Sequence, residues 1–319
     1  MQILIMGSGA VGGYFGGALH RAGLDVTFVA RGDHLDAIQT RGLQINSVAM
    51  GDFVVHPRVI DRLDGFWTAD LVLFCVKSYD NDSAIDVMKP AVAENTTILT
   101  LQNGIGSSDK LSDAFGCDKV LQGVTYVDAT KELPGVVSEV GGPVDIVFGE
   151  EDGSQTPRAL AIRDVLAVDG IDVVLSPNVI KEAWTKLVYI CALSGMTCIV
   201  RSPFEQVVEA PETLELVRGV LSEADAVARA KGVDIDDDIV GRTMARFQGA
   251  DRTATSSMFT DLQRGRPLEV GVLNGAVSRM GMEVGVDTPL NDFIFACLSV
   301  SDRNARLAVP AKIQEKDPS

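Results

Sequence analysis

The stretch "QILIMGSGAVGGYFGGALHRAGLDVTFVAR", residues 2–31, joins two apolar runs through a glycine cluster and an apolar helix. Residues 2–6 predict a short buried strand, GxGxxG follows at Gly7, Gly9 and Gly12, and residues 25–30 predict a second strand. A strand, glycine turn, helix and strand within about 30 residues is the context that the dinucleotide-binding motif requires. The alternative is a glycine-rich turn in a doubly wound domain that holds no ligand.

Each of the three glycines has a physical role in such a turn. Gly7 allows the tight turn, Gly9 lets backbone N–H groups approach a pyrophosphate, and Gly12 lets the helix pack closely on the strand. We expect these residues to contact the cofactor: Gly7, Ser8, Gly9, Ala10, Val11 and Gly12.

The end of the second strand indicates which dinucleotide binds. NAD-binding versions usually carry an acidic residue there, which accepts from the ribose 2′-OH. This chain has Arg31 instead, a cation suited to a 2′-phosphate, although Asp33 follows and could cap the next helix. We therefore predict NADPH rather than NADH, and the alternative is that Arg31 is a solvated surface cation.

Two more strands predict further residues near the cofactor. Residues 69–76 are continuously apolar, as in parallel strands buried on both faces, and Lys77 follows them. Residues 97–101 predict the next strand, and Asn103 follows it. Ligands of open α/β sheets bind at the carboxyl ends of the strands, so Lys77 and Asn103 are cofactor candidates by position. Solvation of Lys77 and turn formation by Asn103 are the alternatives.

The remaining sequence divides into a β-rich part and a helical part. The segments "VLQGVTYV", "GVVSEV" and "VDIVFGE", between residues 120 and 150, predict strands that complete the sheet. A helix over 157–168 and a strand over 172–175 follow, and the chain then becomes helical. We therefore predict a doubly wound α/β domain over residues 1–176 and an all-helical domain over 177–319, with a frayed tail at 310–319.

Composition excludes several classes of function. Lys and Arg total 28 against 44 Asp and Glu, and a formal charge of −16 disfavours nucleic acid as a partner. The five cysteines form no CxxC pair, which favours free thiols in a reducing cytosol and no metal site. The acidic run "DIDDD" at 234–238 lacks the pattern of a calcium loop and predicts a solvated turn with helix capping. No apolar run suggests a membrane span or a signal peptide, so we expect a cytoplasmic protein without a membrane partner.

One lysine and one acidic residue of the helical part are candidates for chemistry. Lys186 lies in "AWTKLVYICAL", and burial there would lower the pKa of its ammonium toward the range useful for proton donation. The alternative is a lysine whose head group reaches water. Ser256 and Ser257 predict a helix start, and a helix beginning near Pro267 would carry Glu269 in its first turns. Capping and the helix dipole would explain these residues without catalysis.

Taken in order, these segments resemble the ketopantoate reductases (2-dehydropantoate 2-reductases). The resemblance covers nearly the whole chain through "GSGAVGGYFGGAL", Arg31, "VKSYD", "LQNGIG", "WTKLVYICALSGMT" and "SSMFTDLQRGRPLEVGVLNG". It implies a Rossmann-type domain with NADPH and a helical domain like that of 6-phosphogluconate dehydrogenase. It also implies a 2-oxo acid substrate and a role in pantothenate biosynthesis. The helical second domain suggests a homodimer.

The resemblance also implies roles for single residues. Lys186 would be the general acid, Glu269 a substrate-orienting or proton-network carboxylate, and Ser257 a substrate-binding hydroxyl. Asn103 would lie near the nicotinamide and the substrate, Arg31 at the 2′-phosphate, and Lys77 at the adenosine side. Reduction of a ketone fits these roles, because the developing alkoxide needs a charge partner and a proton.

The chain departs from the family at the far wall of the substrate site. Ile190, Ser194 and Ala254 stand where the family often has asparagines. Ser194 keeps one hydroxyl for the substrate, but a wall with fewer amides should select less strongly for the distal hydroxyl of ketopantoate. Three hypotheses therefore remain: a ketopantoate reductase, a D-2-hydroxy acid dehydrogenase for other branched or aromatic 2-oxo acids, and a non-catalytic NADPH-binding sensor.

Overall fold

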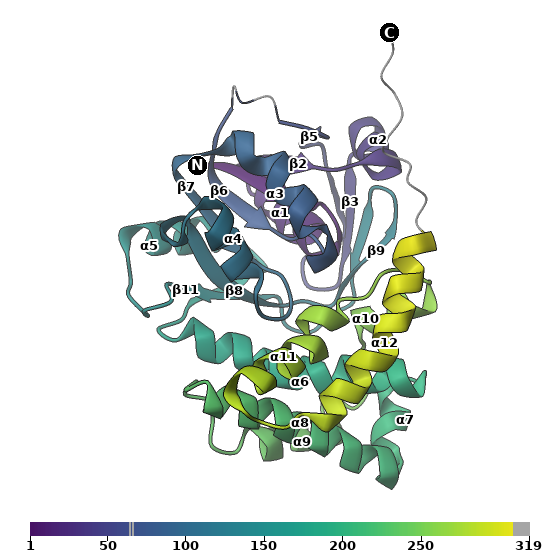
Figure 1. The fold of residues 1–319 in the computed structure, drawn as a ribbon. Helices are drawn as coiled ribbons and strands as arrows, with labels where there is room; N and C mark the ends of the chain where they lie inside the picture. The colour runs from purple at the N-terminus through teal and green to yellow at the C-terminus, as the bar shows by residue number, and fades with distance from the viewer. Residues whose placement is uncertain (64, 66, 309–319) are drawn as a thin grey trace. The chain divides into compact units, whose positions relative to one another are not determined.

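The computed structural model describes residues 1–63, 65 and 67–308, so the tail expected at 310–319 lies outside the described residues. The chain forms two compact units, Met1–Lys186 and Leu187–Ser319. The division lies inside the long helix α6 (Val179–Val200), whereas the sequence suggested a boundary at residue 176. The first unit is mixed α/β and the second is helical (Figure 1).

The first unit is built on an eight-stranded sheet in the order β12-β11-β8-β7-β6-β1-β2-β5. Its strands are β1 (Gln2–Met6), β2 (Asp25–Val29), β5 (Arg58–Ile60), β6 (Ala69–Phe74), β7 (Val92–Thr100), β8 (Val120–Tyr126), β11 (Asp145–Gly149) and β12 (Asp172–Leu175). Neighbouring strands pair in parallel, except that β8 and β11 pair with each other in antiparallel fashion. The order runs outward from β1 in both directions, which confirms the predicted doubly wound sheet and puts the crevice between β1 and β6.

A second, four-stranded sheet has the order β4-β3-β10-β9. Its strands are β3 (Leu43–Ser47), β4 (Phe53–Val55), β9 (Ala129–Leu133) and β10 (Val136–Glu139). The prediction that "GVVSEV" joins the main sheet is therefore wrong. Val137 of β10 pairs in parallel with Ile45 of β3, and both side chains are fully buried. Burial in this second core decides the pairing of β10, and local sequence does not reveal it.

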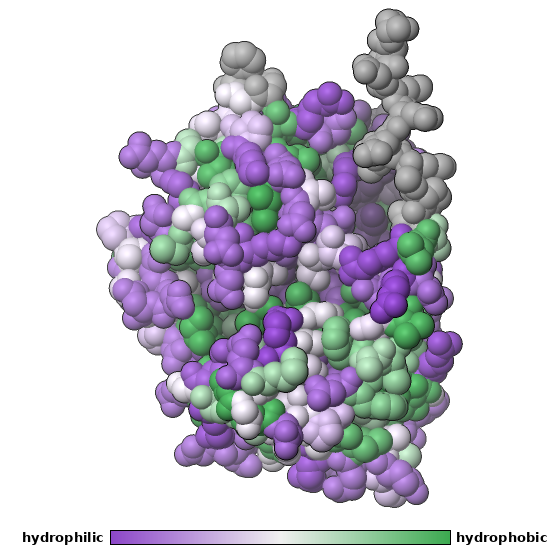
Figure 2. Space-filling view, in the orientation of Figure 1, coloured by the Kyte–Doolittle hydropathy of each residue, from purple (hydrophilic) through white to green (hydrophobic). Residues whose placement is uncertain are grey.

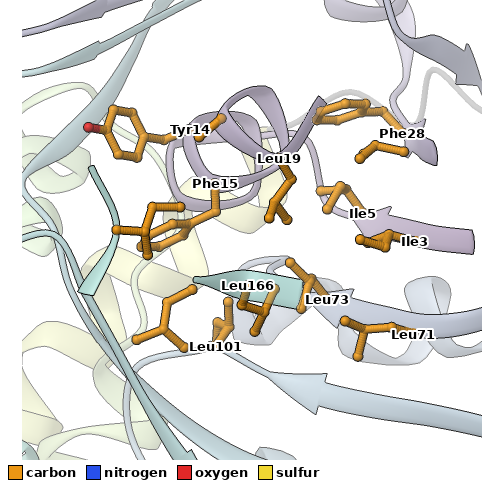
Figure 3. Close-up of a cluster of buried hydrophobic side chains, with 14 of the residues drawn as sticks. Ile3, Ile5, Tyr14, Phe15, Leu19, Phe28, Leu71, Leu73, Leu101 and Leu166 are labelled. Carbon is orange, nitrogen blue, oxygen red and sulfur yellow. The ribbon is translucent and has the colours of Figure 1, made fainter. Parts of the chain in front are cut away.

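Helices cover both faces of the main sheet. The helices are α1 (Ala10–Arg21), α2 (Gly32–Arg41), α3 (Asn81–Met88), α4 (Ser107–Phe115) and α5 (Pro157–Leu166), with short 3₁₀ turns at Ser78–Asp80, Lys89–Ala91 and Cys117–Lys119. One core joins α1, α2 and α5 to the sheet through side chains such as Phe15, Phe28 and Leu166 (Figure 3). A second core joins α3 and α4 to the sheet through Ile85, Met88 and Leu111.

Helix α1 packs between the two sheets, and its glycines make this possible. A Cβ at Gly16 would lie 2.6 Å from the ring of Phe28 in the main sheet. A Cβ at Gly13 would lie 2.9 Å from Val137 in the second sheet. The repeated glycines of the opening stretch therefore serve packing on two faces of one helix as well as the turn before it.

The second unit contains the rest of α6 and the helices α7 (Phe204–Glu209), α8 (Pro211–Ala230), α9 (Ile239–Gln248), α10 (Ser257–Gln263), α11 (Asn274–Val284) and α12 (Pro289–Ala308). The helix predicted to begin near Pro267 is wrong. Only a 3₁₀ turn, η4 (Val270–Val272), follows Glu269, and α11 begins at Asn274. Valine and glycine are poor helix formers, and Leu273 has non-helical dihedral angles of −105° and −106°.

Helix α6 is long and apolar enough to cross a bilayer by length and composition alone. However, 67% of its most apolar window is buried inside the protein, as in the core helix of a globular fold.

Candidate functional site

The glycine turn lies at the carboxyl edge of the main sheet, the edge at which β1, β2, β6, β7 and β8 end. Gly7 has a φ of 100°, and a Cβ there would lie 2.7 Å from the backbone nitrogen of Val76. A Cβ at Gly12 would lie 2.2 Å from the carbonyl oxygen of Gly7. At Gly9 a Cβ would meet no atom of the described chain within 4 Å, its own neighbours aside. Protein packing thus explains Gly7 and Gly12, whereas the space beside Gly9 can receive a ligand.

The N-terminus of α1 has the chemistry of a phosphate site. Gly9 is the N-cap residue, and within the described residues no side chain caps the helix and no acidic residue lies in its first turn. The first N–H groups of a helix lack internal partners and carry partial positive charge, so Ala10, Val11 and Gly12 can donate to an anion. Together with the open space at Gly9, this arrangement fits a dinucleotide pyrophosphate.

Arg31 lies two residues after the carboxyl end of β2 and is the N-cap residue of α2. Its guanidinium lies 3.6 Å from the carboxylate of Asp80, and its side chain is 51% exposed. Such an exposed pair is weak, so Arg31 can turn toward a phosphate at little cost. Lys77 immediately precedes the 3₁₀ turn that contains Asp80, which brings both predicted cations to one part of the edge. Asp33 lies in the first turn of α2 rather than at its cap.

Asn103 lies in the loop after β7, and its neighbour Gln102 holds that loop in place. The Gln102 side chain donates to the carbonyl of Val76 and to the side chain of Asn81, each at 2.7 Å. It therefore ties the ends of β6 and β7 together beside Asn103. Sequence reasoning missed Gln102, although it stands directly before Asn103 in "LQNGIG".

Lys186 is brought to the same edge by the first half of α6. Its ammonium donates a hydrogen bond to the carbonyl of Thr125 and lies 5.3 Å from the centre of the Tyr126 ring. Both residues end β8, which extends beyond its last pair with β7, Thr100 with Gln122. A carbonyl and an aromatic face are both attractive to a cation, so they hold the lysine head group at the carboxyl edge. Nothing in the sequence marked Tyr126 for this role.

The other candidate residues belong to the helical unit. Ser257 is the first residue of α10 and is exposed, while the neighbouring Ser256 caps that helix by accepting from Phe259. Ser194 is only 1% exposed, and Ser256 donates to it at 3.1 Å. Glu269 is 6% exposed and lies just before the η4 turn. Their predicted contacts with substrate remain predictions.

A small cavity of about 150 Å³ lies elsewhere in the first unit, between α4, β8 and α6. Ile105, Gln122, Glu150 and Trp184 are among its lining residues. Glu150 is held by Arg158 at 2.6 Å, which lowers the pKa of that carboxyl against the opposing effect of burial. This pairing gives Glu150 a structural role.

The acidic run at 234–238 also has structural partners. Asp236 forms an ion pair with Arg242, and Asp238 is the N-cap residue of α9 without a side-chain capping bond. Over the residues that the structure describes, no group of three His, Cys, Asp or Glu side chains is arranged to hold a metal ion.

Comparison with known proteins identifies the family. The model of "Ketopantoate reductase PanE/ApbA" matches residues 3–153, and that of its C-terminal domain matches residues 178–301. A 2-dehydropantoate 2-reductase of Archaeoglobus fulgidus is 32% identical over 290 residues, which cover 91% of this chain and 94% of that protein.

Solved structures agree with this assignment. A PanE/ApbA family ketopantoate reductase from Ralstonia eutropha has a TM-score of 0.87 and 34% identity, over 96% of this chain and all of that one. A D-mandelate dehydrogenase solved with NADH and anilino(oxo)acetate has a TM-score of 0.88 at 23% identity, over 96% of this chain and 99% of that one, and shares the fold. The chain therefore belongs to the ketopantoate reductase family of oxidoreductases.

Proposed function

We propose that the protein reduces a 2-oxo acid with NADPH, and that its substrate is 2-dehydropantoate, which becomes pantoate. The observation that carries this proposal is the shared carboxyl edge of the first unit. The glycine turn, Arg31, Asn103 and Lys186 all lie along that edge, on segments that follow or contact the ends of β1, β2, β7 and β8. The family supports the same reaction through relatives named 2-dehydropantoate 2-reductase.

The residues of the first unit would bind the cofactor and assist proton transfer. The N–H groups at the start of α1 hold the pyrophosphate, Arg31 holds the 2′-phosphate, and Lys77 and Asn103 contact the adenosine and nicotinamide sides. NADPH, when bound, supplies the hydride. Lys186 stabilises the negative charge that develops on the substrate oxygen and donates the proton that completes the alcohol. Thr125 and Tyr126 keep the lysine head group in position for that step.

The residues of the second unit would bind the rest of the substrate. Ser257 donates from the exposed first turn of α10, and buried Glu269 orients the polar end of the substrate. Ser194 contributes a hydroxyl beside Ser256.

The experiment that tests the function is NADPH oxidation by the purified protein with a panel of 2-oxo acids that includes ketopantoate. We expect turnover that needs both NADPH and a 2-oxo acid. Tight NADPH binding without turnover of any acid would instead identify a sensor that kept the fold.

The second candidate function is a broader D-2-hydroxy acid dehydrogenase, favoured by Ile190, Ser194 and Ala254. A site that bonds the distal hydroxyl can reject an analogue without it by about 10⁴, whereas an apolar wall gives only about 10 to 10². The ratio of kcat/KM for ketopantoate and 3,3-dimethyl-2-oxobutanoate measures how strictly the site selects ketopantoate, which is turned over in either case. We expect the smaller ratio, and a preference of several thousandfold would restore strict ketopantoate specificity.

A homodimer is part of this proposal, and helix α12 supports it. Phe293, Val300 and Leu307 recur every seven residues on α12, and their side chains are 56%, 56% and 78% exposed. Apolar side chains gather over this helix in Figure 2. A seven-residue apolar stripe suits pairing with the same helix of a second copy around a twofold axis. We expect light scattering to give twice the chain mass, and Val300→Glu to give a monomer.

The cytoplasm is the compartment that we propose. All five cysteines are free, and burial raises the pKa of the Cys75 thiol to about 12. Unpaired thiols, two of them exposed at Cys117 and Cys297, suit a reducing compartment.

A further inference from the structure

His34 connects the glycine turn to two other parts of the first unit. It lies on α2 and is 8% exposed. Its Nε2 lies 2.6 Å from the carbonyl oxygen of Ser8, inside the glycine turn. Its Nδ1 accepts from the backbone N–H of Gly135 at 2.9 Å, in the turn between β9 and β10. One imidazole thus joins the cofactor loop, α2 and the second sheet.

These two partners determine the protonation of the ring. A backbone N–H can only donate, so Nδ1 carries a lone pair, and a carbonyl can only accept, so Nε2 carries the hydrogen. His34 is therefore the neutral Nε2–H tautomer. A proton on Nδ1 would face the N–H of Gly135, and that contact would be lost.

The bond to Ser8 also sets the direction of the next N–H in the loop. Within one planar trans peptide, the C=O and the N–H point in opposite directions. His34 holds the Ser8 carbonyl toward α2, so the N–H of Gly9 in the same peptide points away from α2. A Cβ at Gly9 would meet no atom of the described chain within 4 Å, so a ligand can approach this peptide.

We propose that His34 is a positioning residue for dinucleotide binding: its neutral imidazole fixes the Ser8–Gly9 peptide so that the Gly9 N–H is preset for the pyrophosphate. The inference rests on the proposed binding of a dinucleotide at the glycine turn. It predicts that binding requires His34 to be neutral and therefore weakens in acid.

The surroundings of His34 favour the neutral ring. Burial lowers the pKa of His34, its bond to Ser8 acts in the opposite direction, and the charge of Lys131 on β9 lowers the pKa further. The glycine turn and the Pro134–Gly135 turn both contact the imidazole through backbone atoms. The side chain of Arg41 donates to the carbonyl of Pro134 in the second of these turns. Because the folded pKa lies below the ordinary 6.5, the bond network is complete above pH 6.5 and is lost as pH falls through the folded value.

The test measures the affinity of ADP-ribose by calorimetry between about pH 5 and pH 8. ADP-ribose keeps the pyrophosphate but has neither the nicotinamide nor the 2′-phosphate, so no ligand phosphate titrates in this range and no turnover is needed. We expect His34→Ala to bind about 10-fold more weakly at pH 8, as for the loss of a buried hydrogen bond. In the parent chain, acid should weaken binding by up to the same factor.

His34→Gln separates positioning from mere stability. Glutamine keeps an N–H donor at the end of its side chain and does not titrate, so it should bind within about threefold of the parent at pH 8 and remove the acid effect. His56→Gln, at an exposed histidine, is the matched control and should leave the pH profile unchanged.

Two results would overturn the inference while leaving the proposed function intact. They are parent-like affinity in folded His34→Ala, and an acid loss that persists unchanged in His34→Gln. If the parent chain bound neither ADP-ribose nor NADPH, the proposed function would itself be wrong, and this inference with it.

Discussion

The carboxyl edge of the main sheet and the predicted substrate residues of the helical unit are built in different ways. The edge uses backbone groups and glycines that follow one another in sequence, such as Gly7, Gly9 and Gly12. The helical unit offers side chains from separate elements, Ser194, Ser257 and Glu269. A site built from backbone groups depends on how closely backbone segments and ligand can approach one another. A site built from side chains depends on which polar groups remain available to a ligand.

Packing and ligand binding can be separated at the carboxyl edge more easily than in the helical unit. At the edge, Gly12 serves packing and Gly9 leaves space for a ligand, although both belong to one motif. In the helical unit, Ser256 caps α10 and also donates to Ser194, so the hydroxyl that we propose for substrate at Ser194 is at the same time a packing contact.

The largest expected effect is that of Lys186→Ala. We expect kcat to fall by about 10² to 10⁴, as for loss of a general acid, with little change in the dissociation constant of NADPH. Lys181→Ala on the same helix is the control. Steady-state rates measure kcat, and stopped-flow binding measures the dissociation constant of NADPH. Turnover within a few-fold of the parent would show that another group supplies the proton.

Arg31→Ala should narrow the preference for NADPH over NADH by roughly tenfold to a hundredfold. A charge-assisted contact to phosphate contributes about 1.5 to 3 kcal/mol, and Arg31 has only a half-exposed pair with Asp80 to give up. Fluorescence titration with both cofactors measures the change, with Arg41→Ala as the control. Equal affinities of the parent chain for the two cofactors would contradict the assignment.

Gly12→Ala and Gly9→Ala should separate packing from binding within the motif. A Cβ at Gly12 meets a backbone oxygen at 2.2 Å, so the free energy of unfolding should fall by about 1 to 3 kcal/mol. Gly9→Ala should leave the free energy of unfolding within about 0.5 kcal/mol of the parent and weaken NADPH binding. Denaturant melts and NADPH titrations on both variants check these effects. A larger loss of stability in Gly9→Ala than in Gly12→Ala would contradict the separate roles.

Tyr14→Phe should have the smallest effect. It should change the stability of the fold and not cofactor binding. The buried Tyr14 hydroxyl lies 3.0 Å from that of Ser47 and donates to Glu139, which links α1 to the second sheet. Its loss should lower the free energy of unfolding by about 1 kcal/mol and leave NADPH affinity unchanged. A marked loss of affinity at full stability would mean that the second sheet shapes the cofactor loop more directly.

Local patterns in the sequence predict much of the first unit. Residues 2–31 form the expected β1, α1 and β2, and the apolar run at 69–76 forms β6, because buried parallel strands are continuously apolar. The second sheet escaped prediction because Val136 pairs with Gln44, far along the chain, in strands of three to five residues. Such pairing depends on tertiary packing rather than on local propensity.

Local sequence patterns predict the candidate site only in part, for the same reason. Spacing alone predicted the glycine turn and the edge residues, since strand ends meet at one edge of a parallel sheet. The partners of Lys186 and the two hydrogen bonds of His34 join segments distant in sequence, Thr125 with Lys186 and Gly135 with His34. No local pattern encodes such contacts, and Glu269 shows that even helix position can mislead where Val270 and Gly271 interrupt the expected helix.

Hydride transfer from NADPH to the 2-oxo acid can be followed directly with a deuterium label. The protein is incubated with ketopantoate and NADPH that carries deuterium at both C4 positions, and the product is analysed by mass spectrometry. We predict a 2-hydroxy acid with one deuterium at C2, formed only when protein, cofactor and ketopantoate are all present. Hydroxy acid without deuterium, or no reduction of ketopantoate or any other 2-oxo acid, would contradict it.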